Sequence, residues 1–115
     1  MSAAKFFKCL ADETRLRCVM LLQARDALCV CDLAEALESS QPKVSRHLAQ
    51  LRACDLVSDH REGQWVFYRL HPDLASWQSE VLTRSQAALV AGLPFQEDLR
   101  RLEAAEYRKP ASRCP

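Results

Sequence analysis

Apolar residues recur at intervals of three and four along most of the chain, which is the period of a helix with one buried face. The clearest stripes are Phe6, Phe7 and Leu10, then Leu16, Val19, Met20 and Leu22, and then Val44, Leu48 and Leu51. We therefore predict helices over about residues 4–10, 12–23, 32–38, 41–53 and 73–91, and a charged helical stretch over 96–109.

Polar residues at the expected helix ends support these boundaries. Asp12 is a candidate N-cap, Asp32 and Glu35 follow an acidic variant of the capping box, and Pro42 lies in a first turn, where proline is favoured. Asp55 follows the fourth helix at a position that is commonly left-handed, a conformation that aspartate tolerates.

Two short runs rich in Val, Trp, Phe and Tyr follow the fourth helix. They cover residues 56–60 and 65–70, and the turn between them contains Gly63. This pattern predicts a β-hairpin. Two short helices joined at Ser39 and Ser40, followed at once by a hairpin, predict a mainly α fold of the winged helix-turn-helix type.

Composition agrees with one packed domain. The chain has 115 residues, of which 49% are apolar and 27% charged. We expect a single domain over residues 1–109 and a loose tail over 110–115. No apolar run is long enough to span a bilayer, and lysines interrupt what would be the apolar region of a signal peptide, so we expect a cytoplasmic protein without membrane contact.

The fourth helix carries a candidate DNA-binding face, because no acidic residue occurs between Gln41 and Ala53. Arg, Lys and Gln side chains read bases in the major groove, and hydroxyl groups hold phosphates. We assign base reading to Gln41, Lys43, Arg46 and His47, phosphate contacts to Ser40 and Ser45, a place on the same face to Gln50, and flanking contacts to Arg61 and Gln64 in the hairpin turn. The alternative is an ordinary solvated face. Since the net charge is only +1, useful affinity requires a homodimer on palindromic double-stranded DNA.

Cys29 and Cys31 are the sharpest chemical feature of the sequence. In an extended segment their side chains point the same way, and the following helix start favours thiolate. Two soft thiolates select a thiophilic ion, and As(III) or Sb(III) fits because it needs only three ligands, whereas structural zinc normally takes four. The alternative is a pair of small buried hydrophobic residues, which is how we interpret Cys18.

Three motifs in order resemble the ArsR/SmtB family of metalloregulatory repressors. They are Leu28-Cys-Val-Cys-Asp-Leu-Ala34, Ser40-Gln-Pro-Lys-Val-Ser-Arg-His-Leu48 and Glu62-Gly-Gln-Trp-Val-Phe-Tyr-Arg-Leu70, and the first is similar to the arsenic-sensing branch. The resemblance covers about residues 6–77 and implies a dimer formed by the first helix, with Phe6 and Phe7, and the long helix over 73–91.

The arsenic-sensing branch typically has a third cysteine at the position of Ala34. The third ligand is therefore open between hydroxide, a small thiol, Cys9, Cys54 and Cys114.

The sequence thus predicts a repressor that leaves its operator when arsenite or antimonite binds Cys29 and Cys31, without an organic cofactor and without enzymatic activity. One alternative is a repressor of the same fold that responds to thiol oxidation by forming a disulfide bond to Cys54 or Cys114. The other is a small thiol enzyme or metal carrier, which the absence of an anion-binding glycine loop disfavours.

Overall fold

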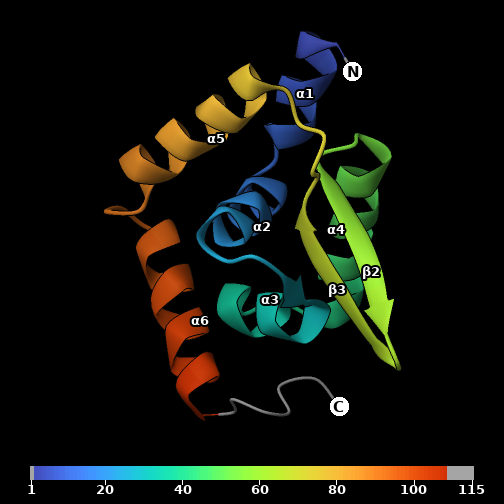
Figure 1. The fold of residues 1–115 in the computed structure, drawn as a ribbon. Coiled ribbons are helices and arrows are strands. Elements are labelled where there is room, and N and C mark those ends of the chain that lie inside the picture. The colour runs from blue at the N-terminus through green and yellow to red at the C-terminus, as the bar shows by residue number, and fades with distance from the viewer. Residues whose placement is uncertain (1, 109–115) are drawn as a thin grey trace.

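A computed structural model describes residues 2–108, which form six helices and a small antiparallel sheet (Figure 1). The elements in chain order are α1 (Ala3–Leu10), α2 (Glu13–Ala24), β1 (Leu28–Cys29), α3 (Val30–Leu37), α4 (Gln41–Ala53), β2 (Val57–Glu62), β3 (Trp65–Leu70), α5 (Ser76–Leu89) and α6 (Phe95–Arg108). The predicted fold class, mainly α with a winged helix-turn-helix, is confirmed. The expected tail over 110–115 lies outside the described residues.

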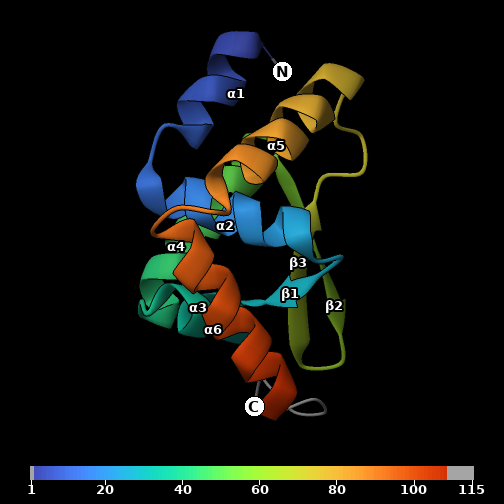
Figure 2. The same cartoon turned by 90° about the vertical axis from the view of Figure 1, so that its left-hand side faces the viewer.

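Helix α2 forms the centre of the core, between the sheet on one side and α5 and α6 on the other (Figures 1 and 2). Its residues 18–22 are all buried. Asp12 caps the helix as predicted, because its Oδ1 accepts a hydrogen bond of 3.0 Å from the Arg15 amide. This bond lowers the pKa of Asp12 below its ordinary value.

Helix α3 begins at Val30, two residues before the predicted start. Strand β1 is the reason, since Leu28 pairs with Tyr68 and Cys29 with Phe67, so Cys29 is held extended at the N-cap. The predicted capping role of Asp32 is wrong. Its side chain is buried, and Oδ2 lies 3.3 Å from the sulfur of Cys29.

The turn between α3 and α4 is short and fixes the two helices relative to each other. Glu38 ends α3 in the left-handed conformation, with φ of 52°, and the Ser40 hydroxyl accepts a hydrogen bond from the Lys43 amide to cap α4. The apolar stripe Val44, Leu48 and Leu51 faces the core and is fully buried, as predicted. Asp55 follows α4 with φ of 59°, which confirms the left-handed position.

Strands β2 and β3 form the wing. Their register runs from Val57 opposite Leu70 to Glu62 opposite Trp65, so the turn consists of only two residues. Gly63 has φ of +64°, the sign that two-residue hairpin turns require at their first position. Strand β2 is therefore longer than predicted, because Arg61 and Glu62 continue the ladder instead of forming the turn.

Helix α5 begins three residues later than predicted, where the Gln78 side chain accepts a hydrogen bond of 2.8 Å from the Ala75 amide. The chain then turns at Gly92 and the cis bond before Pro94 into α6, which runs back over α2 and α3 (Figure 2). The helical stretch predicted near the C-terminus is thus part of the packed fold.

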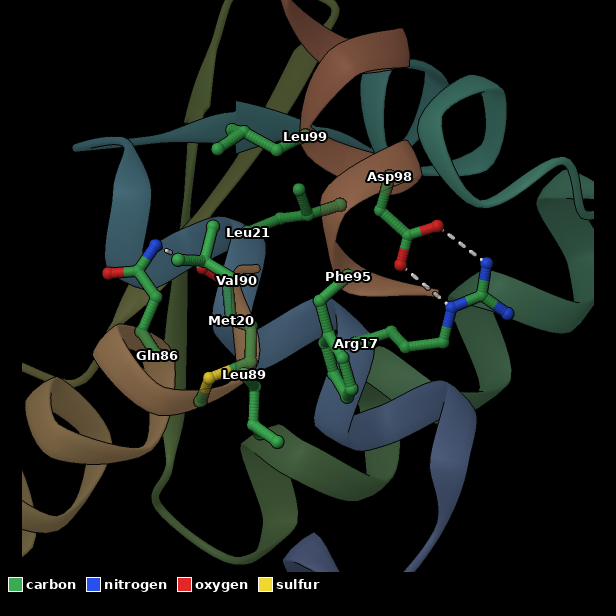
Figure 3. A pocket seen from close by; sticks show the side chains of 9 residues that line it. All are labelled: Arg17, Met20, Leu21, Gln86, Leu89, Val90, Phe95, Asp98 and Leu99. Carbon is green, nitrogen blue, oxygen red and sulfur yellow. Dashed lines mark hydrogen bonds and ion pairs between the residues drawn. The ribbon is translucent and has the colours of Figure 1, made fainter. Parts of the chain in front are cut away.

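A buried ion pair anchors α6. Asp98 is 1% exposed, and its two oxygens lie 2.6 and 2.8 Å from the Arg17 guanidinium of α2 (Figure 3). Arg101 also bonds Asp98, at 2.9 Å, and its Nε donates to the Ala36 carbonyl of α3 at 2.7 Å. The adjoining cavity between α2, α5 and α6 is about 10 Å³, the lower limit for one water molecule. The three helices are therefore closely packed.

Within residues 2–108, no helix is both long enough and apolar enough to cross a membrane.

Substitution of Asp98 by Asn tests this anchor. Removing one partner of a buried ion pair leaves the other charge uncompensated, so we expect Asp98→Asn to lower the free energy of unfolding by about 3 kcal/mol. The measurement is urea unfolding at neutral pH. The matched control is Glu97→Gln, which removes a solvent-exposed pair with Arg100 and should leave the free energy of unfolding almost unchanged. Equal losses in the two variants would contradict the anchoring role.

Candidate functional site

The solvent face of α4 presents polar and basic side chains without a covering element. Gln41, Lys43, Ser45 and Arg46 are all exposed, and the buried stripe holds this helix by its opposite side. Arg46 points most directly away from that stripe, because each residue advances 100° around a helix. The structure therefore brings four of the predicted DNA-contact residues to one open face, beside the capping Ser40.

The structure does not place the His47 side chain with them. The His47 ring is mostly buried, and Nδ1 lies 3.8 Å from Oδ1 of Asp12. Gln50 is exposed on the same face as Arg46, four residues further on, and its Oε1 accepts a hydrogen bond of 2.8 Å from Arg15. Both side chains contact the start of α2, so the assignment of His47 to base reading is not supported. Sequence periodicity misses this because His47 lies at the border between the buried and exposed faces.

The wing carries the remaining predicted DNA contacts. Arg61 and Gln64 are exposed near the turn of the hairpin, at the opposite end of the β2–β3 pairing from the buried Val57. Arg52, near the end of α4, bonds Asp59 of β2 at 2.9 Å. This exposed ion pair links the wing to α4, so the two surfaces have a defined relative position.

The cysteine pair lies where β1 passes into α3. Cys29 is non-helical, as predicted, and is 3% exposed. Cys31 is in the first turn of α3 and is half-buried, so the segment between the two sulfurs is not extended throughout. Cys29 is the N-cap of α3, and Cys31 lies in its first turn, where the helix dipole favours negative charge.

A direct contact joins this pair to the DNA-facing helix. The side-chain amide of Gln41, the first residue of α4, donates a hydrogen bond of 3.4 Å to the sulfur of Cys31. Any ligand that binds the Cys31 sulfur competes with this bond. The site is therefore coupled to the first turn of α4.

The three candidate third ligands are placed differently. Cys54 caps the far end of α4, about 20 Å from Gln41 at 1.5 Å per residue, and Cys9 lines the same groove as Cys54. The structure thus does not bring Cys9 or Cys54 to the Cys31 sulfur of the same chain. Cys114 lies outside the described residues. Among residues 2–108, no three His, Cys, Asp or Glu side chains group closely enough to hold a metal ion.

Comparison with known proteins agrees with this geometry. Residues 12–59 match the family described as bacterial regulatory protein, arsR family. The arsenic resistance transcriptional regulator ArsR1 of Pseudomonas putida is 57% identical over 76 residues, which are 66% of this chain and 59% of that protein. The arsenical resistance operon repressor of Escherichia coli is 53% identical over 78 residues, or 68% of this chain and 67% of that protein.

This chain belongs to the arsR family. The resemblance inferred from the three motifs is thereby confirmed. The aligned part of this chain spans only 59% of the length of the Pseudomonas putida relative. Among solved structures, reduced HlyU from Vibrio cholerae aligns with a TM-score of 0.68 and 32% identity, over 76% of this chain and 87% of that one. The arsR-family fold is thus supported by sequence and by structure.

Cys18 belongs to the core of this arsR-family fold. It is fully buried on α2, and burial raises its pKa to about 12. At neutral pH it remains a thiol, which is a poor metal ligand and a poor nucleophile. Its predicted role as a core residue is consistent with this position.

Alkylation should distinguish the cysteines by their environment. With iodoacetamide at pH 8, we expect Cys54, which is half-buried at the surface, to be labelled in the native protein while Cys18 is not. Raising the pH to 10 should leave Cys18 unlabelled, because its pKa is about 12 and only the thiolate reacts. Peptide mass mapping provides the measurement, and labelling in urea is the control. Equal labelling rates of the two cysteines in the native state would refute the assignment.

Proposed function

We propose that this protein is a transcriptional repressor that binds operator DNA and leaves it when arsenite or antimonite binds Cys29 and Cys31. Its arsR-family membership and the names of its relatives, both arsenic resistance regulators, support this function and the absence of an enzymatic role. The observation that carries the proposal is the bond between Gln41 and the sulfur of Cys31, because it connects the ligand site to the DNA-facing helix.

The DNA-bound form uses α4 and the wing. In this proposal Lys43 and Arg46 enter the major groove, Gln41 and Ser45 contact bases and backbone beside them, and the Arg61 and Gln64 side chains reach the flanking DNA. The complex is cytoplasmic, where the operator DNA lies.

The protein acts as a homodimer on a palindromic operator. Phe7 and Trp77 support this, because they are 50% and 41% exposed and their rings lie 6.0 Å apart on neighbouring faces of α1 and α5. The buried Phe6 ring packs edge-on against Trp77, with ring centroids 5.1 Å apart, so Phe6 supports the exposed aromatic surface from the core side. A large exposed aromatic surface of this kind is typical of a subunit interface.

In the reduced protein, two thiolates supply part of the ligand sphere. As(III) and Sb(III) take three soft ligands, and the donor set of Cys29 and Cys31 fits two of these positions. The third belongs to Cys114, to hydroxide or to a small thiol. Zinc, which normally takes four ligands in structural sites, fits this pair less well.

Release follows from competition at Cys31. A ligand on that sulfur removes the Gln41 bond and moves the first turn of α3, and α4 follows because the turn between the two helices is only three residues long. The ligand and the operator then weaken each other by a coupling free energy of about 1–3 kcal/mol.

Fluorescence anisotropy on the promoter DNA of its operon tests this function. We expect arsenite and antimonite to lower operator affinity of the reduced wild type by about tenfold to a hundredfold, and zinc to leave it unchanged. Cys29→Ser/Cys31→Ser should bind the operator as the wild type does and remain bound when arsenite is added.

A second variant separates DNA reading from ligand binding. Arg46→Ala should cost about 1–3 kcal/mol of operator affinity, whereas Arg100→Ala, at an exposed position on α6, should cost almost nothing. Operator binding that survives Arg46→Ala unchanged would contradict the proposed interface. Release of Cys29→Ser/Cys31→Ser by arsenite would contradict the proposed ligand site.

A further inference from the structure

A second pair of cysteines lies at the other end of α4. Cys9, near the end of α1, and Cys54, the C-cap of α4, line one groove, and the Cys54 amide donates to the Gln50 carbonyl at 3.1 Å. The Cys9 sulfur also lies 3.8 Å from the Gln50 carbonyl oxygen. Arg15 links α1 to α4 here, because its Nε donates to the Cys9 carbonyl at 2.7 Å and its Nη1 donates to the Gln50 side chain at 2.8 Å. Cys9 and Cys54, from elements far apart in the sequence, therefore meet at the Gln50 carbonyl and line the same groove.

An open groove of about 410 Å³ adjoins this pair. Its walls are formed by Cys9, Cys54 and Ala53, the stems of Lys5 and Lys8, and the Arg15 and Gln50 side chains. Cys9 is 5% exposed at the floor, and Cys54 is half-buried at the side. The groove thus offers one accessible thiol, a second thiol behind it, and space beside both for an organic group.

The donor set and its protonation restrict the ligand. Burial, followed by the hydrogen bond with Cys54, raises the pKa of Cys9 to about 12, so at neutral pH it is a thiol. A divalent cation requires thiolates, and within residues 2–108 no third His, Cys, Asp or Glu joins the pair. Trivalent arsenic that already carries one carbon substituent needs only two sulfur ligands. It can bind two neutral thiols, and the reaction releases water.

We propose that Cys9 and Cys54 form a dithiol site for trivalent monoorganoarsenicals, R–As(OH)2. Each sulfur forms one bond to arsenic and each As–O bond breaks. The two thiol protons leave with the two hydroxyl groups as two molecules of water. Arsenic remains trivalent and neither sulfur is oxidised. The product is neutral, which suits the buried position of Cys9, and the substituent R lies in the groove between Lys5 and Lys8.

This site is independent of the one proposed at Cys29 and Cys31, so its test uses a background without those two cysteines and without Cys114. In Cys29→Ser/Cys31→Ser/Cys114→Ser, only Cys9, Cys18 and Cys54 remain. We expect this variant to take up one equivalent of phenylarsine oxide, which hydrates to phenyl-As(OH)2, with loss of two titratable thiols. Intact mass spectrometry and peptide mapping should show one phenylarsenic bridging the peptides of α1 and α4.

Further substitution in that background decides the ligands. Adding Cys54→Ser should weaken uptake about a hundredfold or more, because a single thiol loses the advantage of a chelating pair. Adding Cys9→Ala should do the same, and adding Cys18→Ala should leave uptake unchanged. Circular dichroism verifies that each variant is folded.

Three results would overturn the proposal. They are a background variant that takes up no phenylarsine oxide, an adduct that persists unchanged after Cys54→Ser, and inorganic arsenite binding as tightly as the phenyl compound. In the last case the site would not depend on a carbon substituent as the third ligand.

Discussion

The hydrogen bond from Gln41 to the sulfur of Cys31 connects the cysteine pair to the first turn of α4. It is possible only because the left-handed Glu38 and the capping Ser40 bring the first turns of α3 and α4 together. Since protein interiors are close-packed, a displacement at one helix start is passed on rather than absorbed. A change at the sulfur of Cys31 is therefore a change at the first turn of α4.

Helix α6 determines how freely α3 can respond. The buried Asp98 binds Arg17 on α2, and Arg101 bonds both Asp98 and the Ala36 carbonyl of α3. Separating Asp98 from the two guanidinium groups would leave its buried carboxylate uncompensated, so the arrangement resists partial opening. The C-terminal end of α3 is thus tied to α6, whereas its N-terminal turn contacts α4 through Gln41.

Much of the fold could be predicted from local patterns. The stripe of Val44, Leu48 and Leu51 and the cap at Asp12 depend on periodicity and local hydrogen bonds, and the structure confirms them. The start of α3 was predicted wrongly because β1, which holds Cys29 extended, is only two residues long and pairs with a distant strand. Contacts between remote residues, such as Cys9 with the Gln50 carbonyl, leave no local signal in the sequence.

Reciprocal binding provides the most direct test of the coupling between the cysteine pair and α4. The measurement is calorimetric titration of arsenite into the reduced wild type, once without DNA and once with saturating operator. The account predicts that operator lowers arsenite affinity by the same factor by which arsenite lowers operator affinity, because linkage is symmetric. Equal arsenite affinities with and without operator would contradict it, since the ligand site and α4 would then be uncoupled.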